Sequence, residues 1–464
     1  MRQPRRRRKA RSQPDSIPVN QATQDPQPPT RRHWFARRWL CSFLVIVLLA
    51  LIATDAPGML ARAMANRAAG QLDNASAERW ISVAKSVSWR HGEMELLSAR
   101  LLRRQGHADE LEQALQRAIR SGADSKLVSL ERALAQAQSG SLASVEPQLF
   151  DALRNGLGDS AEISDAYANG LTISSRFDQA LKVLQAWQID YPKDPRPAYR
   201  IGRIYEHKAV WDKAQEHYRQ SISVSPTYYP ARFRLGRALM YDRQLEAAKD
   251  EFAACLSMAN PIAAQIQIAS CLKALASTNQ ATELLREVLK NDDAKILASY
   301  AALEETPEHH EAARILGDLE FELGNNAEAV RWLEHALAFN DRDSSSRYSL
   351  AVTLREMGRE EEAEEHFARF QVVREALSRA NVLRSRIQAD SEDIDARFEL
   401  GELLLTHESI RMGLFWLRSV LETQPDHQGA HQALAKYYSD LAVNAPEYKT
   451  LADFHRQQFR LVTP

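Results

Sequence analysis

The chain has 464 residues, with modest Gly and Pro contents of 17 and 18 residues, and it is rich in Ala, Leu, Glu and Arg. Runs of β-branched residues are nearly confined to one early segment, so the composition excludes a β-rich fold and favours an almost all-helical protein. The formal net charge of −1 hides an asymmetry, because residues 1–38 carry 11 Lys and Arg against 2 Asp, whereas the remainder has a net charge of −10.

Residues 1–38 combine two basic runs, 5–9 and 31–32, with a Pro- and Gln-rich interval. They lack the apolar residues needed to offset chain entropy, so we expect a disordered cytoplasmic tail. Nucleic-acid binding through residues 5–9 is one interpretation of the charge. A topogenic cluster beside a membrane segment is the preferred one, because Arg37 and Arg38 abut an apolar run, and no nucleic-acid partner is expected.

An uncharged run follows, from Trp39 to Thr54. As a helix it spans about 24 Å, against about 30 Å for the hydrocarbon core of a bilayer. We therefore predict a single transmembrane signal anchor over residues 39–55, with the N-terminus in the cytoplasm and the rest of the chain extracytoplasmic, which means periplasmic in a bacterium. A cleaved signal peptide is the alternative, since Ala63-Met64-Ala65 is a small-x-small sequence.

Helical patterning continues beyond the anchor. Residues 56–160 show small and large residues at helical spacing in three degenerate units that begin near residues 58, 92 and 126. From residue 161 the pattern becomes regular, and it is clearest in the two units that begin at residues 195 and 229. Their corresponding residues recur at one fixed interval and are Ile201 and Leu235, Gly202 and Gly236, Tyr205 and Leu239, Ala214 and Ala248, Tyr218 and Phe252, and Ser221 and Cys255. A fixed period of this length indicates a repeat protein.

The small and large residues recur at positions 7, 8, 11, 20, 24, 27 and 32 of each unit, and this register resembles that of the tetratricopeptide repeat (TPR) family. The resemblance implies an all-α fold, a right-handed α-solenoid of helical hairpins A and B. It divides the rest of the chain into a TPR array (161–293), an insertion (294–307), a TPR pair (308–377), a helical extension (378–393) and a final TPR pair with a C-terminal capping helix (394–464).

Motifs of catalysis and metal binding do not stand out. The sequence has no phosphate-binding loop, nucleophile elbow or HExxH motif, and its three cysteines form no CxxC pair. Cys255 and Cys271 are expected to be buried thiols, with a disulfide as the alternative. Adjacent His309 and His310 diverge by about 100° on a helix, so we expect a helix start rather than a chelate. We therefore expect no catalytic residue, no cofactor and no metal.

The resemblance implies that positions 2, 5, 9, 12 and 13 of each helix A line the inner face of the solenoid. This set contains aromatic residues beside arginines, which suit an extended peptide with acidic groups. The candidate groove residues are Arg196, Tyr199, Arg203, His207, Phe233, Arg237, Tyr241, Tyr348 and Phe398. The alternative is that the aromatic residues at position 5 simply pack against the neighbouring unit.

These expectations favour a noncatalytic scaffold or adaptor that presents its groove to protein partners, outside the cytoplasm, for assembly of an envelope complex. A regulatory or substrate-recruiting subunit of an enzyme whose catalytic site is in another chain is the alternative. A third possibility, an enzyme with its own site in insertion 294–307 or 378–393, has no supporting group of residues.

Overall fold

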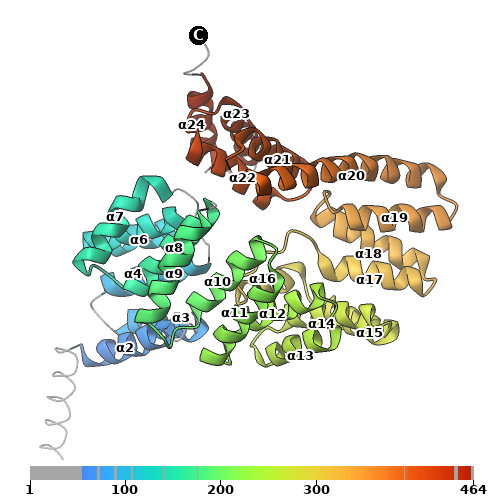
Figure 1. The fold of residues 1–464 in the computed structure, drawn as a ribbon. Helices are drawn as coiled ribbons and strands as arrows, with labels where there is room; N and C mark the ends of the chain where they lie inside the picture. Colours follow the sequence, from blue (N-terminus) through green and yellow to red (C-terminus); the bar gives the residue numbers. More distant parts are fainter. Residues whose placement is uncertain are drawn as a thin grey trace, which may run out of the picture. The chain divides into compact units, whose positions relative to one another are not determined.

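A computed structural model describes residues 55–70, 74–87, 91–105, 108–138, 142–174, 176–390, 392–443 and 448–460. The chain forms two compact units, Met1–Trp89 and Arg90–Pro464, which are described separately. Throughout the described ranges the regular secondary structure is helical and no strand occurs, which confirms the all-α prediction (Figure 1). The predicted tail, residues 1–38, and the predicted transmembrane helix up to residue 54 are not among the described residues. None of the helices that are described is long and apolar enough to span a membrane.

The first unit contains the helices α2 (Ala56–Gly70) and α3 (Asn74–Val87). The second unit begins with α4 (His91–Gln105), α5 (Ala108–Arg120), α6 (Ser125–Gln138), α7 (Leu142–Asn155), α8 (Ser160–Ile173), α9 (Phe177–Asp190), α10 (Arg196–His207), α11 (Trp211–Val224), α12 (Tyr229–Tyr241), α13 (Leu245–Ala254), the 3-10 turn η1 (Cys255–Ser257), α14 (Ile262–Ala274) and α15 (Thr278–Val288). It continues with α16 (Asp293–Ala301), α17 (Glu311–Glu322), α18 (Asn326–Phe339), α19 (Ser344–Glu356), α20 (Glu360–Ala389), α21 (Ile394–His407), α22 (Ile410–Thr423), α23 (Gln428–Ala442) and α24 (Lys449–Arg460).

Consecutive helices pair as hairpins, and in the described ranges there are eleven of them, each with a first helix that begins at or next to a predicted repeat start. One helix stands outside this order. α15 packs directly against α17, while α16 packs on α14. The stack therefore passes from α15 to α17 without using the intervening segment, which is where the insertion was predicted. The predicted extension is the second half of the single long helix α20.

One close contact recurs inside the hairpins and explains the small and large residues of the repeat. In four hairpins a glycine of the first helix faces a large side chain of the second helix, so closely that a Cβ atom would come within 2.6–2.9 Å of it. The pairs are Gly202 and Tyr218, Gly236 and Phe252, Gly317 and Leu333, and Gly401 and Leu417. The large partners are fully buried, with relative exposures of 0%, and cannot turn away into solvent. Repeat positions 8 and 24 therefore set the distance between the two helices.

The turn between the two helices of a hairpin also repeats. Its last residue but one has a positive φ angle in five hairpins, as Ala209, Arg243, Ala276, Gly324 and Gly358, with values of 55–79°. Only two of the five are glycines, although the left-handed region costs other residues about 1 kcal/mol. The hairpin geometry is thus imposed by packing on either side of the turn as well as by its residues.

The two cysteines of the described region are buried, free thiols. Burial raises the pKa of Cys255 to about 12 and that of Cys271 to about 11. Because a thiol with so high a pKa is scarcely ionised at neutral pH, these residues act as small core side chains, as the preferred interpretation of the sequence had it.

We predict that Gly236→Ala destabilises the chain by about 1–3 kcal/mol, because the new methyl group overlaps the ring of Phe252. In a Phe252→Ala background the same substitution should be neutral or stabilising, since the clash is gone and Ala favours the helix by about 1 kcal/mol over Gly. Thermal unfolding of the wild type, the two single variants and the double variant checks this. Equal effects of Gly236→Ala in both backgrounds would contradict the packing assignment.

Candidate peptide-binding groove

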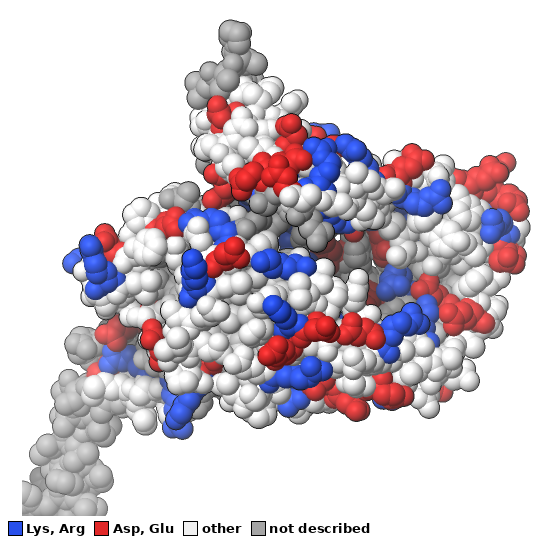
Figure 2. Space-filling view, in the orientation of Figure 1, with Lys and Arg blue, Asp and Glu red and all other residues white. Residues whose placement is uncertain are grey.

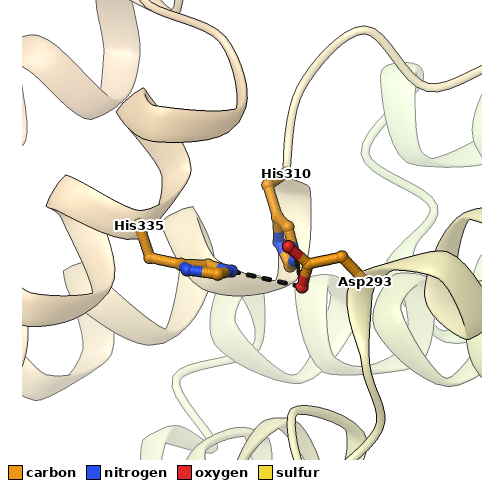
Figure 3. A group of neighbouring side chains, drawn as sticks. All are labelled: Asp293, His310 and His335. Atoms are coloured by element: carbon orange, nitrogen blue, oxygen red, sulfur yellow. Dashed lines mark hydrogen bonds and ion pairs between the residues drawn. The ribbon is translucent and has the colours of Figure 1, made fainter.

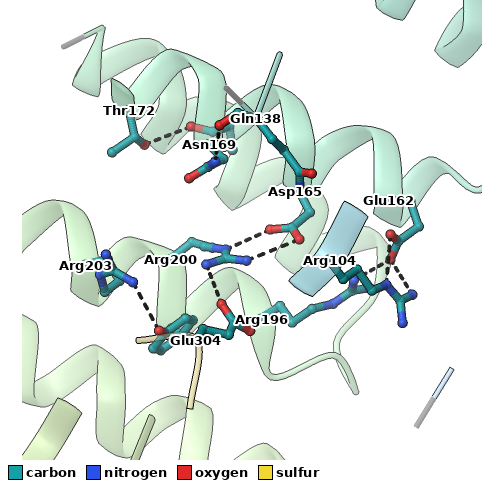
Figure 4. Close-up of polar contacts among 12 residues, drawn as sticks. Arg104, Gln138, Glu162, Asp165, Asn169, Thr172, Arg196, Arg200, Arg203 and Glu304 are labelled. Atoms are coloured by element: carbon teal, nitrogen blue, oxygen red, sulfur yellow. Dashed lines mark hydrogen bonds and ion pairs between the residues drawn. The ribbon is translucent and has the colours of Figure 1, made fainter. Parts of the chain in front are cut away.

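Ion pairs link the first helices of successive hairpins. The carboxylate of Glu162 in α8 accepts hydrogen bonds from Arg103 and Arg104 of α4, at 2.8 and 2.7 Å, and from Arg196 of α10, at 2.6 Å (Figure 4). The side chain of Glu162 is only 1% exposed. Burial opposes its ionisation, but Arg104, Arg196 and Arg103 outweigh burial and lower the pKa of Glu162 well below its usual value. These charges therefore hold helices α4, α8 and α10 side by side.

Three of the predicted groove residues are part of this interior. Arg196 is buried between Glu162 and Asp194 and lies over the ring of Trp187. Tyr199 is 0% exposed, with its ring edge-on to Tyr228. Phe233 is 1% exposed and contacts Phe252 and Tyr300. For the two aromatic residues the structure supports the packing alternative, and all three side chains are buried.

Four predicted residues reach solvent near the C-terminal ends of α10 and α12. Arg203 is half-buried and donates a hydrogen bond of 3.2 Å to the hydroxyl oxygen of Tyr199. His207 is exposed and stacks on Phe415 of α22, with ring centroids 6.4 Å apart. The side chain of Arg237 is 47% exposed. Tyr241 is 67% exposed and stacks on Trp211.

The remaining two aromatic residues belong to other hairpins. Tyr348 is 47% exposed and contacts Phe367 and Phe370 of its own hairpin. Phe398 is half-buried against Gly429 and His427, which are residues of the following hairpin. These ring contacts are local to the C-terminal hairpins, and they do not join Tyr348 or Phe398 to the surface of α10 and α12.

An acidic segment of the chain itself lies on α10 and α12. We call residues 303–308, between α16 and α17, the strap. Glu304 accepts hydrogen bonds from Arg200 of α10, at 2.7 Å, and from the hydroxyl of Tyr228, at 2.8 Å. Arg200 lies between this carboxylate and that of Asp165 in α8 (Figure 4). Glu304 and Arg200 are 104 positions apart in sequence, so the contact is made by the fold alone.

The next carboxylates of the strap make equivalent contacts. Glu305, whose side chain is 6% exposed, accepts a hydrogen bond of 2.7 Å from Arg234 of α12 and lies 3.4 Å from the guanidinium of Arg237. Glu308 accepts a hydrogen bond of 3.0 Å from the backbone amide of Arg411, in the first turn of α22. The strap thus connects α10 and α12 with α22, and all three of its carboxylates are bound.

Arg234 is the charge on which these contacts converge. It is buried, and besides Glu305 it binds Glu206 of α10 at 2.7 Å. Burial opposes the charge of Glu206, but Arg234 and the hydroxyl of Tyr218 outweigh burial and lower the pKa of Glu206 to about 2. Burial and then Glu304 raise the pKa of Tyr228 well above its usual value. At neutral pH Glu206 is therefore ionised and Tyr228 is a neutral donor.

Towards solvent, the cations of this surface form longer ion pairs than the buried arginines do, and Arg237 lies 3.4 Å from Glu305. Although part of His207 reaches solvent, desolvation and then Arg203 lower the pKa of His207 to about 4, so the imidazole is neutral at pH 7. Desolvation lowers the pKa of Arg411, and Arg234 and Arg203 lower it further, against the opposing effect of Glu308, which lies 3.8 Å away. A carboxylate placed here is stabilised by several positive charges.

A separate cluster has the composition of a metal site. Asp293, His310 and His335 bring their ligand atoms within 4.8 Å of one another (Figure 3). However, Nδ1 of His310 accepts a hydrogen bond of 3.2 Å from the amide of Ala313, as the N-cap of α17. A neutral imidazole that accepts at Nδ1 carries its proton on Nε2, where it faces Asp293 at 3.2 Å, so this nitrogen has no lone pair for a metal. The cluster is better explained as a polar link between α16, α17 and α18.

The molecular surface shows how charge is distributed outside the groove. On the face seen in Figure 2, basic and acidic side chains alternate across the second unit and neither sign gathers into a broad patch. A duplex-binding surface needs clustered Lys and Arg, and this face does not provide it.

The prediction from sequence missed four residues that form the groove contacts: Arg200, Arg234, Glu304 and Glu305. The two arginines have a signal, because they occupy the same position of successive repeat units, each directly after a position-5 aromatic residue. The two glutamates have no such signal. They stand in the predicted insertion, and no spacing relates them to the arginines that they bind.

Comparisons with known proteins add little to this geometry. No protein-family model and no curated protein matches the chain. Similar solved structures are helical repeat proteins. PilW, described as a widely conserved type IV pilus biogenesis factor, is 18% identical, with 46% of this chain and 94% of PilW covered and a TM-score of 0.39. Pseudomonas aeruginosa PilF is 13% identical, with 53% and 99% covered and a TM-score of 0.33. A human IFIT1 dimer with PPP-AAAA is 15% identical, with 79% and 86% covered and a TM-score of 0.39. Such low scores transfer no function, and the repeat assignment depends on the hairpins themselves.

We predict that the loss of stability in acid is smaller in Glu206→Gln than in the wild type. The lowered pKa of Glu206 stabilises the fold above pH 4.5, and this contribution, on the order of 2 kcal/mol, is lost as the pH falls from 4.5 towards 2. Thermal unfolding at pH 5 and pH 3 measures the difference. Glu216→Gln, a change at an exposed residue of α11, is the control. Identical losses in all three proteins would show that Glu206 has no strong partner.

Proposed function

We propose that this chain is a noncatalytic scaffold or adaptor that holds a protein partner against the first helices of its central hairpins. The observation that supports this proposal is the strap, because the surface of α10 and α12 already binds an acidic peptide segment through Arg200 and Arg234. Arginine and aromatic residues together are the usual anchors of such surfaces. The chemistry of the expected partner, a peptide segment with acidic groups, follows from the same contacts.

We propose further that the N-terminal helix predicted at residues 39–55 anchors the chain in a membrane as a single-pass protein. Its basic flank, Arg37 and Arg38, favours a cytoplasmic N-terminus and therefore an extracytoplasmic repeat array. In this location the scaffold would serve the assembly of an envelope complex. Protease protection in intact spheroplasts or vesicles tests the topology, and digestion of the array from the cytoplasmic side would exclude it.

We predict that Arg203→Glu together with Arg237→Glu removes the main partner. Both side chains reach solvent at the groove mouth, and reversal of their charge repels a carboxylate without breaking the buried network around Glu162. The measurement is crosslinking followed by affinity purification of the full chain from detergent-solubilised membranes, with quantification of a stoichiometric partner. A loss of at least ten-fold in recovery is expected.

The matched control changes the same net charge at Lys182 of α9 and Arg374 of α20, two exposed residues, to Glu. This variant should retain the partner. Unchanged capture by the Arg203 and Arg237 variant would exclude the groove as the binding surface. Intrinsic turnover by the purified chain would contradict the scaffold and favour an enzyme.

A further inference from the structure

The strap is not required to continue the repeat stack. α15 contacts α17 directly, so the array is continuous without α16 and the strap. α16 is held to the array by buried Ile296 and Tyr300, whereas the strap that follows begins with buried Leu303 and is otherwise held through its carboxylates. The segment therefore combines an apolar anchor with a polar, separable end.

The backbone of the strap turns just after α16. Glu304 has φ = 55°, a left-handed conformation that also follows the helices before Ala209, Arg243 and Ala276. Its amide and that of Glu305 donate hydrogen bonds to carbonyl oxygens of the last turn of α16. This turn directs the chain toward α10, where Glu304 meets Arg200 and Tyr228.

The buried arginines of the groove keep carboxylate partners when the strap is removed. Without Glu304, Arg200 keeps Asp165, and without Glu305, Arg234 keeps Glu206. Both guanidinium groups therefore stay paired, whereas a buried charge without a partner costs several kcal/mol. Arg237 and Arg411, by contrast, form ion pairs with Glu305 and Glu308, at 3.4 and 3.8 Å, and lose them when the strap is removed. The vacated groove is therefore a folded surface with an excess of positive charge.

We propose that the groove under the strap is the partner-binding surface and that the strap is a built-in competitor for it. This inference rests on the proposed function and adds the identity of the ligand class: a peptide turn in which an apolar residue is followed by two adjacent carboxylates, as in Leu303-Glu304-Glu305. A partner segment of this kind replaces the strap on Arg200 and Arg234. Because the strap is tethered, its effective concentration is in the millimolar range, so it masks the site from weak ligands.

The test uses the strap sequence as its own probe. A fluorescent peptide with the sequence of residues 300–309 is titrated into the full chain and into a variant with Glu304→Lys and Glu305→Lys, in which the strap is repelled by the groove arginines. We expect the variant to bind the peptide at least ten-fold more tightly than the wild type. A peptide in which the same two glutamates are glutamines should lose this binding.

The matched control carries Glu216→Lys and Glu283→Lys, an equal change of charge at exposed residues of α11 and α15, and should bind the peptide as the wild type does. Where the thermal unfolding of the lysine variant shows that it is misfolded, Glu304→Gly with Glu305→Gly replaces it, since glycine suits the backbone at residue 304. This second variant removes the carboxylates without adding charge, and the same ten-fold gain is expected.

Three results would overturn the inference. The first is a folded strap variant that does not bind the peptide, and the second is equal binding by the variant and the wild type. The third is binding of a short single-stranded RNA by the variant in place of the peptide. Should the peptide fail while a protein partner is still captured through Arg203 and Arg237, the role of the strap is rejected and the scaffold proposal stands.

Discussion

The central hairpins depend on arginines that are almost out of water and must be matched by carboxylates. Arg103 and Arg234 have side chains that are 1% and 7% exposed, and guanidinium groups keep their charge at any physiological pH. An unpaired charge at such a site is strongly destabilising, so each arginine constrains where an acidic partner must lie. Glu162 meets this need between α4 and α10, and Glu206 and Glu305 meet it around Arg234. The relative positions of the helices, and the path of the strap, both follow from this requirement.

Two kinds of interaction thus determine how the helices pack. Within a hairpin, a glycine against a large buried side chain determines how closely two helices approach, as for Gly236 and Phe252. Between hairpins, charge pairs on the first helices select the neighbour and its register. The first kind is generic and recurs with the repeat. The second includes Arg103 of α4, which binds Glu131 of α6 and Glu162 of α8, and it recurs between α14 and α17, where Lys273 binds Asp318.

The hairpins were predictable from sequence because each is made by residues close in the chain, at a spacing that recurs. Gly202 and Tyr218 belong to one hairpin, and their counterparts Gly236 and Phe252 lie one repeat further on. The groove was only partly predictable. Tyr199 and Phe233, which were predicted to line the groove, are buried, because Tyr228 before α12 packs on Tyr199 and Tyr300 of α16 packs on Phe233. The contact of Arg234 with Glu305, distant in sequence, has no local signature, and only the folded chain reveals it.

A scaffold whose groove is already filled binds its partner by exchange, and its affinity is set by the difference between two similar sets of contacts. Binding by exchange requires that the strap be held by Arg234. Hydrogen exchange of the peptide covering residues 300–310 tests this most directly, in the wild type, in Arg234→Gln and in Arg374→Gln as the control. Exchange faster than in the wild type is expected in Arg234→Gln and not in Arg374→Gln. Equal exchange in all three proteins would contradict the claim that Arg234 holds the strap.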